Sequence, residues 1–183
     1  MLAAGTAYVN VGGGEPDRCF VRGLALRQLG YRVLVMVDAD KPPTAATVQA
    51  YVDAGGEYIT WREGRALEDE LFLSLPDAGV DALLQRAIDL VEEDLVAAHI
   101  QTQSNGQLAL AQIRLQRQQL GMPYPLATRQ LLGLAARNRK NGWFKSVTKF
   151  EDVARDILGP YCQISEPEFV AMITRLYRWA HAA

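Results

Sequence analysis

An unbroken apolar run extends from Val33 to Val37 and contains three valines. A run of this kind is typical of a strand that is covered on both faces, as in a parallel sheet. Residues 7–11 and 57–61 form two further short runs with strand-like composition. The pattern therefore predicts three strands in the first third of the chain.

Two helical stripes separate these runs. One begins near Asp17 and ends at Gly30, and the other begins near Thr44 and ends before Gly56. Asp and Thr are residue types that cap helix starts, and glycine commonly ends a helix. The order strand, helix, strand, helix, strand predicts a small α/β domain with parallel strands and right-handed crossovers over residues 1–65.

From residue 66 onward the apolar positions follow the 3.6-residue spacing of amphipathic helices. We expect helices over residues 66–76, 80–101, 108–120, 128–139, 150–158 and 166–181. The chain is therefore predicted to join its α/β domain to a mostly helical domain, residues 66–183.

Composition restricts the class of protein less than the pattern does. The 183 residues carry a formal net charge of −2, so a phosphate-binding surface would have to be local. Cys19 and Cys162 are too few for a disulfide scaffold or a zinc site and are expected to be inert thiols in a reducing cytosol. His99 and His181 are expected at the surface or in packing. No apolar run approaches membrane-spanning length, so we expect a cytoplasmic protein without a membrane partner.

Two carboxylates, Asp38 and Asp40, directly follow the central apolar run. Parallel sheets bind ligands outside the carboxyl ends of their strands, and an extended backbone directs side chains two residues apart to the same side. Two carboxylates so placed favour a hard divalent cation. A polar strand end that begins a turn is the structural alternative, and the dipeptide motif alone does not separate the two interpretations.

A second acidic group lies at the start of the predicted 66–76 helix, with Glu68 and Asp69 as its candidates for function. The helix dipole favours anions at this position, which gives these residues a purely structural interpretation. The sheet edge that presents the two aspartates is also expected to present the end of the third strand and the residues after it. Glu68, or Asp69 beside it, could therefore complete a metal site.

The densest basic region surrounds the segment Gly142-Trp-Phe-Lys145. Its cations are Arg137, Arg139, Lys140, Lys145 and Lys149. Local positive charge in a chain of net negative charge favours phosphate contact, and Lys145 could neutralise charge that develops on a scissile phosphate. A solvated basic turn is the structural alternative for the lysines, and Trp143 and Phe144 are expected to be core anchors.

Together these segments resemble the carboxyl-terminal region of the OLD (overcoming lysogenisation defect) family of nucleases. The likeness rests on the glycines at 12–14 and on the segments Val37-Asp-Ala-Asp40, Ala66-Leu-Glu-Asp-Glu-Leu-Phe72 and Gly142-Trp-Phe-Lys145. It covers nearly the whole chain. In that family a Toprim domain, which is a small Rossmann-like α/β fold, carries a helical insertion and follows an ABC-type ATPase on the same polypeptide.

The resemblance implies metal-dependent cleavage of DNA phosphodiesters with two divalent ions, Mg²⁺ or Mn²⁺. Asp38 and Asp40 would bind metal and act in catalysis, and Glu68 or Asp69 would assist from the helical side. Lys145 would be the catalytic lysine, so residues 140–150 would return to the active site. The other four cations of the basic region would contact DNA.

The resemblance also implies parts that do not match this sequence. A Toprim domain begins with a strand that ends in a glutamate, and neither the residues before Ala7 nor Glu15 corresponds to it. We therefore expect the chain to be cut from a longer polypeptide that supplies the missing strand and the ATPase. A homodimer could form through that missing part.

Two other functions stay open. One is a Toprim-like module that binds DNA or a partner without cleavage, which the missing amino-terminal glutamate favours. The other is a phosphatase of the haloacid-dehalogenase type, in which the first aspartate of Asp-x-Asp is a phosphorylated nucleophile and the second a general acid. Pro42, and the lack of a later acidic pair after a strand, depart from that type.

Overall fold

The computed structural model describes residues 6–12, 14–145 and 147–182, which form two compact units. The first unit contains the described residues as far as Ala66 and those from Ala171 onward, and the second is Leu67–Val170. The sequence pattern placed residues 66–183 in one helical domain. The structure instead groups the residues from Ala171 onward with the first unit, so the last helix belongs partly to each unit.

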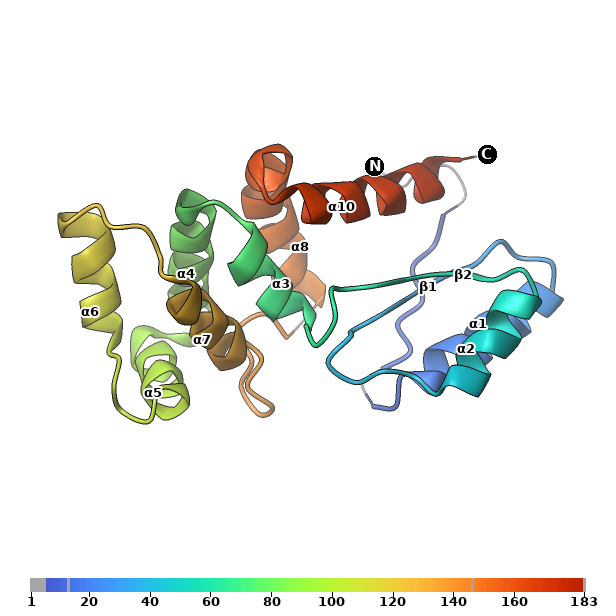
Figure 1. Ribbon diagram of the computed structural model, residues 1–183, viewed down its shortest axis with the longest axis horizontal. Coiled ribbons are helices and arrows are strands. Elements are labelled where there is room, and N and C mark those ends of the chain that lie inside the picture. Colours follow the sequence, from blue (N-terminus) through green and yellow to red (C-terminus); the bar gives the residue numbers. More distant parts are fainter. Residues whose placement is uncertain (1–5, 13, 146, 183) are drawn as a thin grey trace. The chain divides into compact units, whose positions relative to one another are not determined.

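A two-stranded parallel sheet forms the centre of the first unit (Figure 1). Strand β1 (Leu34–Val37) pairs with β2 (Glu57–Thr60), with Leu34 opposite Glu57. Helix α1 (Asp17–Gln28) precedes β1, and α2 (Ala45–Asp53) connects the two strands. The α/β class predicted from the sequence is confirmed in this general sense, and most of the remaining chain is helical. The Toprim fold stays a prediction.

The predicted strand over residues 7–11 is wrong, because the described residues 6–12 form no strand. Tyr8 and Val9 have 78% and 51% of their surface exposed. Alternating apolar residues stabilise a strand only when one of its faces is buried. These side chains bury no face, so their composition does not produce a third strand.

The core of the first unit packs β1 against both helices. Val35 and Val37 are buried together with Phe20 of α1 and Tyr51 of α2. The Phe20 and Tyr51 rings meet edge to face with centroids 5.5 Å apart. A Cβ on Gly23 would lie 2.7 Å from Val35 Cγ2, so only glycine lets α1 approach the strand this closely. This packing fixes where β1 ends and therefore where the residues after it lie.

The two faces of β1 are not equally covered. Val35 and Val37 are buried, whereas Leu34 and Met36 are half-buried. The prediction that both faces of this strand are buried is therefore correct for the face of Val35 and Val37, and the face of Leu34 and Met36 is only partly covered.

The second unit is helical, as the 3.6-residue spacing predicted. Its elements are α3 (Leu67–Ser74), α4 (Asp77–Val91), α5 (Glu93–Gln103), α6 (Leu110–Arg114), the π-helical η1 (Leu115–Gln119), α7 (Leu126–Ala136), α8 (Val147–Val153), the π-helical η2 (Ala154–Leu158), α9 (Gly159–Tyr161), the 3-10 helix η3 (Cys162–Ile164) and the beginning of α10 (Pro167–His181). In the described part of the chain, none of these helices combines the length and the apolar composition that crossing a bilayer requires.

The predicted helix over residues 80–101 is divided in two at Glu92. Glu92 has φ 71° and ψ 150°, a conformation that ends α4 and places α5 in a new direction. The apolar stripe continues across this break, and so the sequence pattern does not reveal it.

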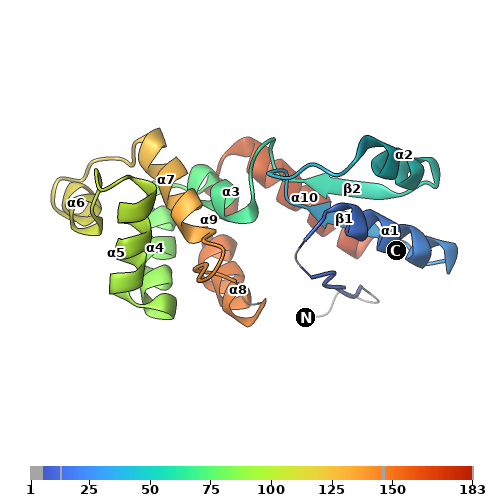
Figure 2. The same cartoon turned by 90° about the horizontal axis from the view of Figure 1, so that it is seen from below.

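Helices α3 and α7 lie side by side in the second unit (Figure 2). Leu71, Phe72 and Leu132 are fully buried between them and their neighbours. A Cβ on Gly133 of α7 would lie 2.8 Å from the Cα of Asp69 in α3. The two backbones therefore approach closely at the point where α3 carries its acidic residues.

Candidate functional site

The loops after the two strands are joined at the carboxyl end of the sheet. The backbone N–H of Ala39 donates to the carbonyl oxygen of Arg65 at 2.9 Å, and the N–H of Gly64 donates to the carbonyl oxygen of Ala39 at 3.2 Å. Ala39 lies between Asp38 and Asp40, both of which are exposed. The prediction that one sheet edge presents both loops is confirmed, and the two aspartates lie at that edge.

The amino-terminal ends of α1 and α2 meet at one hydrogen-bonded contact. Asp17 Oδ1 accepts from the backbone N–H of Thr44 at 2.8 Å and lies 3.1 Å from the Thr44 hydroxyl. The expectation that Asp17 caps its own helix is wrong, because Pro16 is the N-cap of α1 and Asp17 serves the start of α2. Thr44 is the N-cap residue of α2 as predicted, although its own side chain makes no capping hydrogen bond. Two helix starts, each with a partial positive charge, are thereby fixed to each other.

A cation and a carboxylate both act on the Cys19 thiol in α1. Burial raises the pKa of Cys19, while Arg22 lowers it and Asp38 raises it. The Cys19 side chain is half-buried, and this burial is the main cause of its raised pKa.

The acidic residues of α3 are held inside the second unit. Glu68 is half-buried and Asp69 is buried. Asp69 Oδ2 pairs with Arg137 Nη1 at 3.0 Å. The third acid, Glu70, is fully buried, and its Oε1 accepts from Ser74 Oγ at 3.0 Å. Glu68 is the most accessible of the three acids.

Two of the predicted DNA-contacting residues and the predicted catalytic lysine surround one cavity of about 380 Å³, which we term the lysine pocket. It is lined by Lys140, Lys145, Lys149, Asn141, Gly142, Val91 and Leu95. The Lys145 amine donates to the carbonyl oxygen of Arg139, and Lys149 Nζ lies 3.5 Å from the carbonyl oxygen of Leu90. The pocket thus combines three ammonium groups with an apolar floor.

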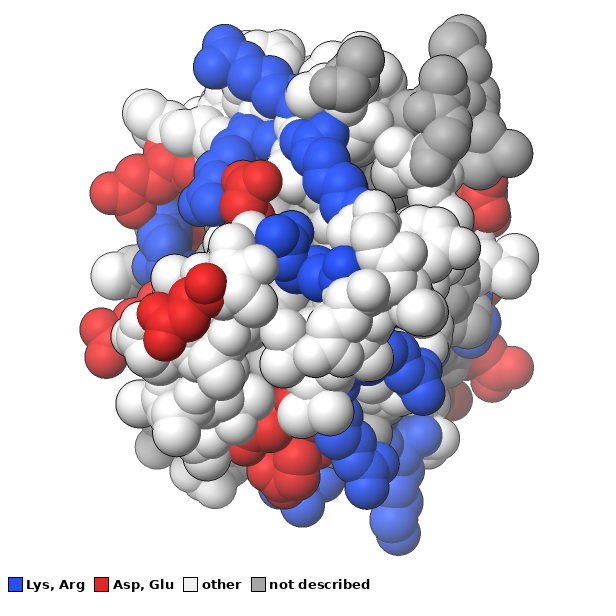
Figure 3. Space-filling model, turned by 90° about the vertical axis from the view of Figure 1, so that its right-hand side faces the viewer, with Lys and Arg blue, Asp and Glu red and all other residues white. Residues whose placement is uncertain are grey.

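The remaining cations of the basic region have other positions. Arg137 pairs with Asp69, and the exposed Arg139 contributes its carbonyl to Lys145 but does not line the pocket. Sequence reasoning missed Val91 and Leu95, which lie on the apolar stripe of the predicted 80–101 helix and gave no separate signal. Figure 3 shows another part of the surface, the right-hand side of Figure 1, where basic side chains cross the middle of the face with acidic ones beside them.

Buried aromatic residues anchor the segment that forms the lysine pocket. Trp143 is fully buried and Phe144 is 5% exposed, which confirms that both are core anchors. Trp143 Nε1 donates to Nδ1 of His99 at 3.1 Å. His99 is therefore a packing residue, and burial lowers its pKa. A neutral imidazole accepts at Nδ1, so the contact requires His99 to be uncharged.

The fit of a metal ion differs between the two units. Within the described residues, no three or more His, Cys, Asp or Glu side chains form a group that could hold a metal ion. Asp38 and Asp40 lie in the first unit, and Glu68 and Asp69 lie in the second. Mg²⁺ is commonly bound by one or two carboxylates, several waters and substrate phosphates. Asp38 and Asp40 supply two carboxylates of that kind, although Ala39 and Asp40 form a bend and not the extended backbone that the sequence predicted. Neither unit by itself holds the full predicted ligand set.

Comparison with protein-family models, with curated proteins and with solved structures gave no match. The resemblance to the OLD family therefore stays a prediction.

Proposed function

We propose that this chain is the catalytic region of a metal-dependent DNA endonuclease. The observation that carries the proposal is the position of Asp38 and Asp40, which are exposed at the carboxyl end of a parallel strand. The loop that they form is hydrogen-bonded to the loop after the neighbouring strand. This edge is where open α/β sheets bind ligands, and paired carboxylates suit a hard divalent ion.

The lysine pocket supports contact with a polyanion. Three lysines around one cavity, in a chain of net charge −2, concentrate positive charge at one place. Lysines bind nucleic-acid phosphates with little dependence on sequence. We assign Lys140 and Lys149 to DNA-backbone contact, and Lys145 to the charge of the phosphate that is cleaved.

The roles divide between a bound ion and the side chains of this chain. Asp38 and Asp40 would hold Mg²⁺ or Mn²⁺, which when bound polarises a phosphoryl oxygen and lowers the pKa of bound water. Glu68 would supply a further carboxylate. Lys145 would neutralise negative charge on the phosphate as the phosphodiester bond breaks. A second ion, an ABC-type ATPase on the same polypeptide and a cytoplasmic location belong to the same proposal.

A second candidate is a module that binds DNA or a partner without cleavage. The ion pair between Asp69 and Arg137 favours it, because it occupies a predicted metal ligand and a predicted DNA contact at once. The lysine pocket would contact DNA in the endonuclease and in the binding module alike.

One set of assays separates the candidates. The chain is incubated with supercoiled plasmid and Mg²⁺, Mn²⁺ or Ca²⁺, and in parallel with a generic phosphatase substrate. Nicking with Mg²⁺ or Mn²⁺ supports the endonuclease. DNA binding without nicking under any metal supports the binding module, and phosphate release without nicking contradicts both and supports the phosphatase.

A further inference from the structure

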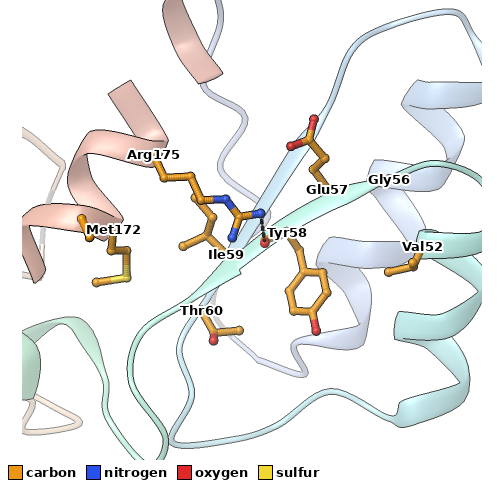
Figure 4. Close-up of a pocket in the computed structure, with 9 residues that line it drawn as sticks. Val52, Gly56, Glu57, Tyr58, Ile59, Thr60, Met172 and Arg175 are labelled. Atoms are coloured by element: carbon orange, nitrogen blue, oxygen red, sulfur yellow. Dashed lines mark hydrogen bonds between the residues drawn. The ribbon is translucent and has the colours of Figure 1, made fainter. Parts of the chain in front are cut away.

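Strand β2 has one edge without a neighbouring strand, because in the described part of the chain the sheet consists of β1 and β2 alone. A cavity of about 660 Å³ runs along β2 (Figure 4). It is lined by Gly56–Thr60, Val52, Ala171, Met172 and Arg175, all within the first unit. Glu57–Thr60 contain neither lysine nor proline, the residues that commonly protect exposed strand edges.

A side chain makes the hydrogen bond that an added strand would make at this edge. Arg175 Nη2 donates to the carbonyl oxygen of Tyr58 at 3.3 Å. Figure 4 shows the guanidinium of Arg175 beside β2, with its hydrogen bond to this carbonyl drawn. A strand paired with β2 would offer a backbone N–H at the same place. In the single chain Arg175 thus satisfies this one carbonyl, and a strand paired with β2 would take its place.

The side chains of β2 alternate between two faces. Tyr58 packs on Phe20 of α1 with ring centroids 5.5 Å apart. Glu57 and Ile59 point to the opposite face, the side from which Arg175 approaches (Figure 4). Ile59 is buried, whereas Glu57 and Arg175 are both exposed. One edge thus presents one anion and one cation on the same face.

We infer that this edge pairs with the same edge of a second copy of the chain, with the two β2 strands antiparallel and Tyr58 at the two-fold axis. Residues opposite each other in an antiparallel pair share a face. Glu57 would therefore lie opposite Ile59 of the second copy, on the face that carries Arg175. Each Glu57 then meets Arg175 of the other copy, which gives the two equivalent contacts that an isologous interface requires.

Charge complementarity identifies the second copy as the occupant. The edge carries its own cation and its own anion, so it complements itself, and the Tyr58 residues of the two copies would lie opposite each other on the other face. An unrelated acidic strand would meet Glu57 as a like charge. The paired strands have four residues each, so the interface is smaller than the roughly 1,600 Å² of a stable complex. The dimer is therefore weak and depends on concentration.

Analytical ultracentrifugation of the full chain from micromolar to millimolar concentration tests the inference. Wild type is expected to show a monomer–dimer equilibrium. Arg175→Glu and Glu57→Arg are each expected to weaken the dimer about tenfold or more, equivalent to about 1.4 kcal/mol. The double variant Arg175→Glu/Glu57→Arg restores it, and Arg178→Glu, an exposed change on the same helix, leaves it unchanged. Circular dichroism verifies that every variant is folded.

Three results would overturn the inference. The first is a folded wild-type chain that stays monomeric at every concentration. A monomer that binds an added extended peptide at β2, and not a second copy, counts as the same result. Another is a dimer that neither single reversal weakens. The last is a double variant that associates no better than the two single variants, because the ion pairs would then not cross the interface.

Discussion

Arg137 Nη1 lies 3.0 Å from Asp69 Oδ2, so a residue predicted to contact DNA neutralises a residue predicted to bind metal. The Asp69 side chain is only 9% exposed and that of Arg137 is 29% exposed. Asp69 lies in the first turn of α3, and Arg137 is the C-cap residue of α7. The pair therefore joins two helices whose backbones approach closely at Gly133.

Breaking this pair is expected to destabilise the fold without changing DNA binding. Asp69→Asn and Arg137→Gln should each lower the free energy of unfolding by about 1–3 kcal/mol, since each leaves a partly buried charge without its counter-ion. Urea denaturation measures this loss. For Arg137→Gln, the salt dependence of DNA affinity should stay that of wild type. If Arg137→Gln instead lowers this slope by the amount expected for one lost phosphate contact, Arg137 contacts DNA.

The close approach of α3 and α7 predicts that a larger side chain at position 133 destabilises the fold. Gly133→Ala should lower stability by about 1–3 kcal/mol, because its Cβ would meet backbone atoms of Asp69 rather than a movable side chain. Gly159→Ala is the matched control, since its Cβ would lie 3.6 Å from its nearest neighbour, the carbonyl oxygen of Ala154. Thermal unfolding of both variants compares them. Equal midpoints would contradict the packing of the two helices.

The lysine pocket is expected to supply separate phosphate contacts. Lys145→Ala and Lys149→Ala should each reduce the slope of log affinity against log salt by about one, and should weaken binding to all DNA sequences alike. Arg178→Ala, an exposed cation on α10, serves as the control and should leave the slope unchanged. Fluorescence anisotropy across a salt series gives the slopes. An unchanged slope in both lysine variants would exclude the pocket from DNA contact.

His99 is expected to make stability depend on pH. Burial lowers the pKa of His99 in the folded chain, so the unfolded chain binds its proton more tightly. The stability that neutral His99 contributes to the fold is fully present above the unfolded pKa of about 6.5. It is lost as pH falls through that value toward the lowered pKa of the folded chain. Protonation also places an N–H of His99 against the N–H of Trp143.

Urea denaturation between neutral and mildly acidic pH measures this effect. Wild type should lose more stability on acidification than His99→Asn, which retains no titrating imidazole at the site. His181→Asn is the control and should follow wild type. Identical pH profiles for wild type and His99→Asn would contradict the buried, neutral state of His99.

The elements that sequence reasoning located correctly are those with a strong local pattern. The Val33–Val37 run became β1, and residues 57–61 became β2, because each pairs with the other and packs on buried side chains. The run at 7–11 is also rich in valine and tyrosine but has no buried face. Composition states what a segment can form, and the packing of distant segments decides whether it does.

The site could be predicted only in part for the same reason. The order of elements placed Asp38 and Asp40 at a sheet edge, and the basic density located the lysines of the pocket. The ion pair between Asp69 and Arg137 joins residues far apart in the chain, and no local pattern encodes it. The break at Glu92 is equally hidden, since it lies within a continuous apolar stripe.

Nicking of supercoiled plasmid in Mn²⁺ by matched aspartate variants tests the central claim most directly. Asp38→Asn and Asp40→Asn keep side-chain size but remove the charge that would hold the ion, and each should reduce the nicking rate about 100-fold or more. Asp53→Asn, an exposed change at the end of α2, should nick like wild type. If Asp38→Asn and Asp40→Asn both nick plasmid as fast as wild type, the assignment of these two aspartates to the catalytic site is contradicted.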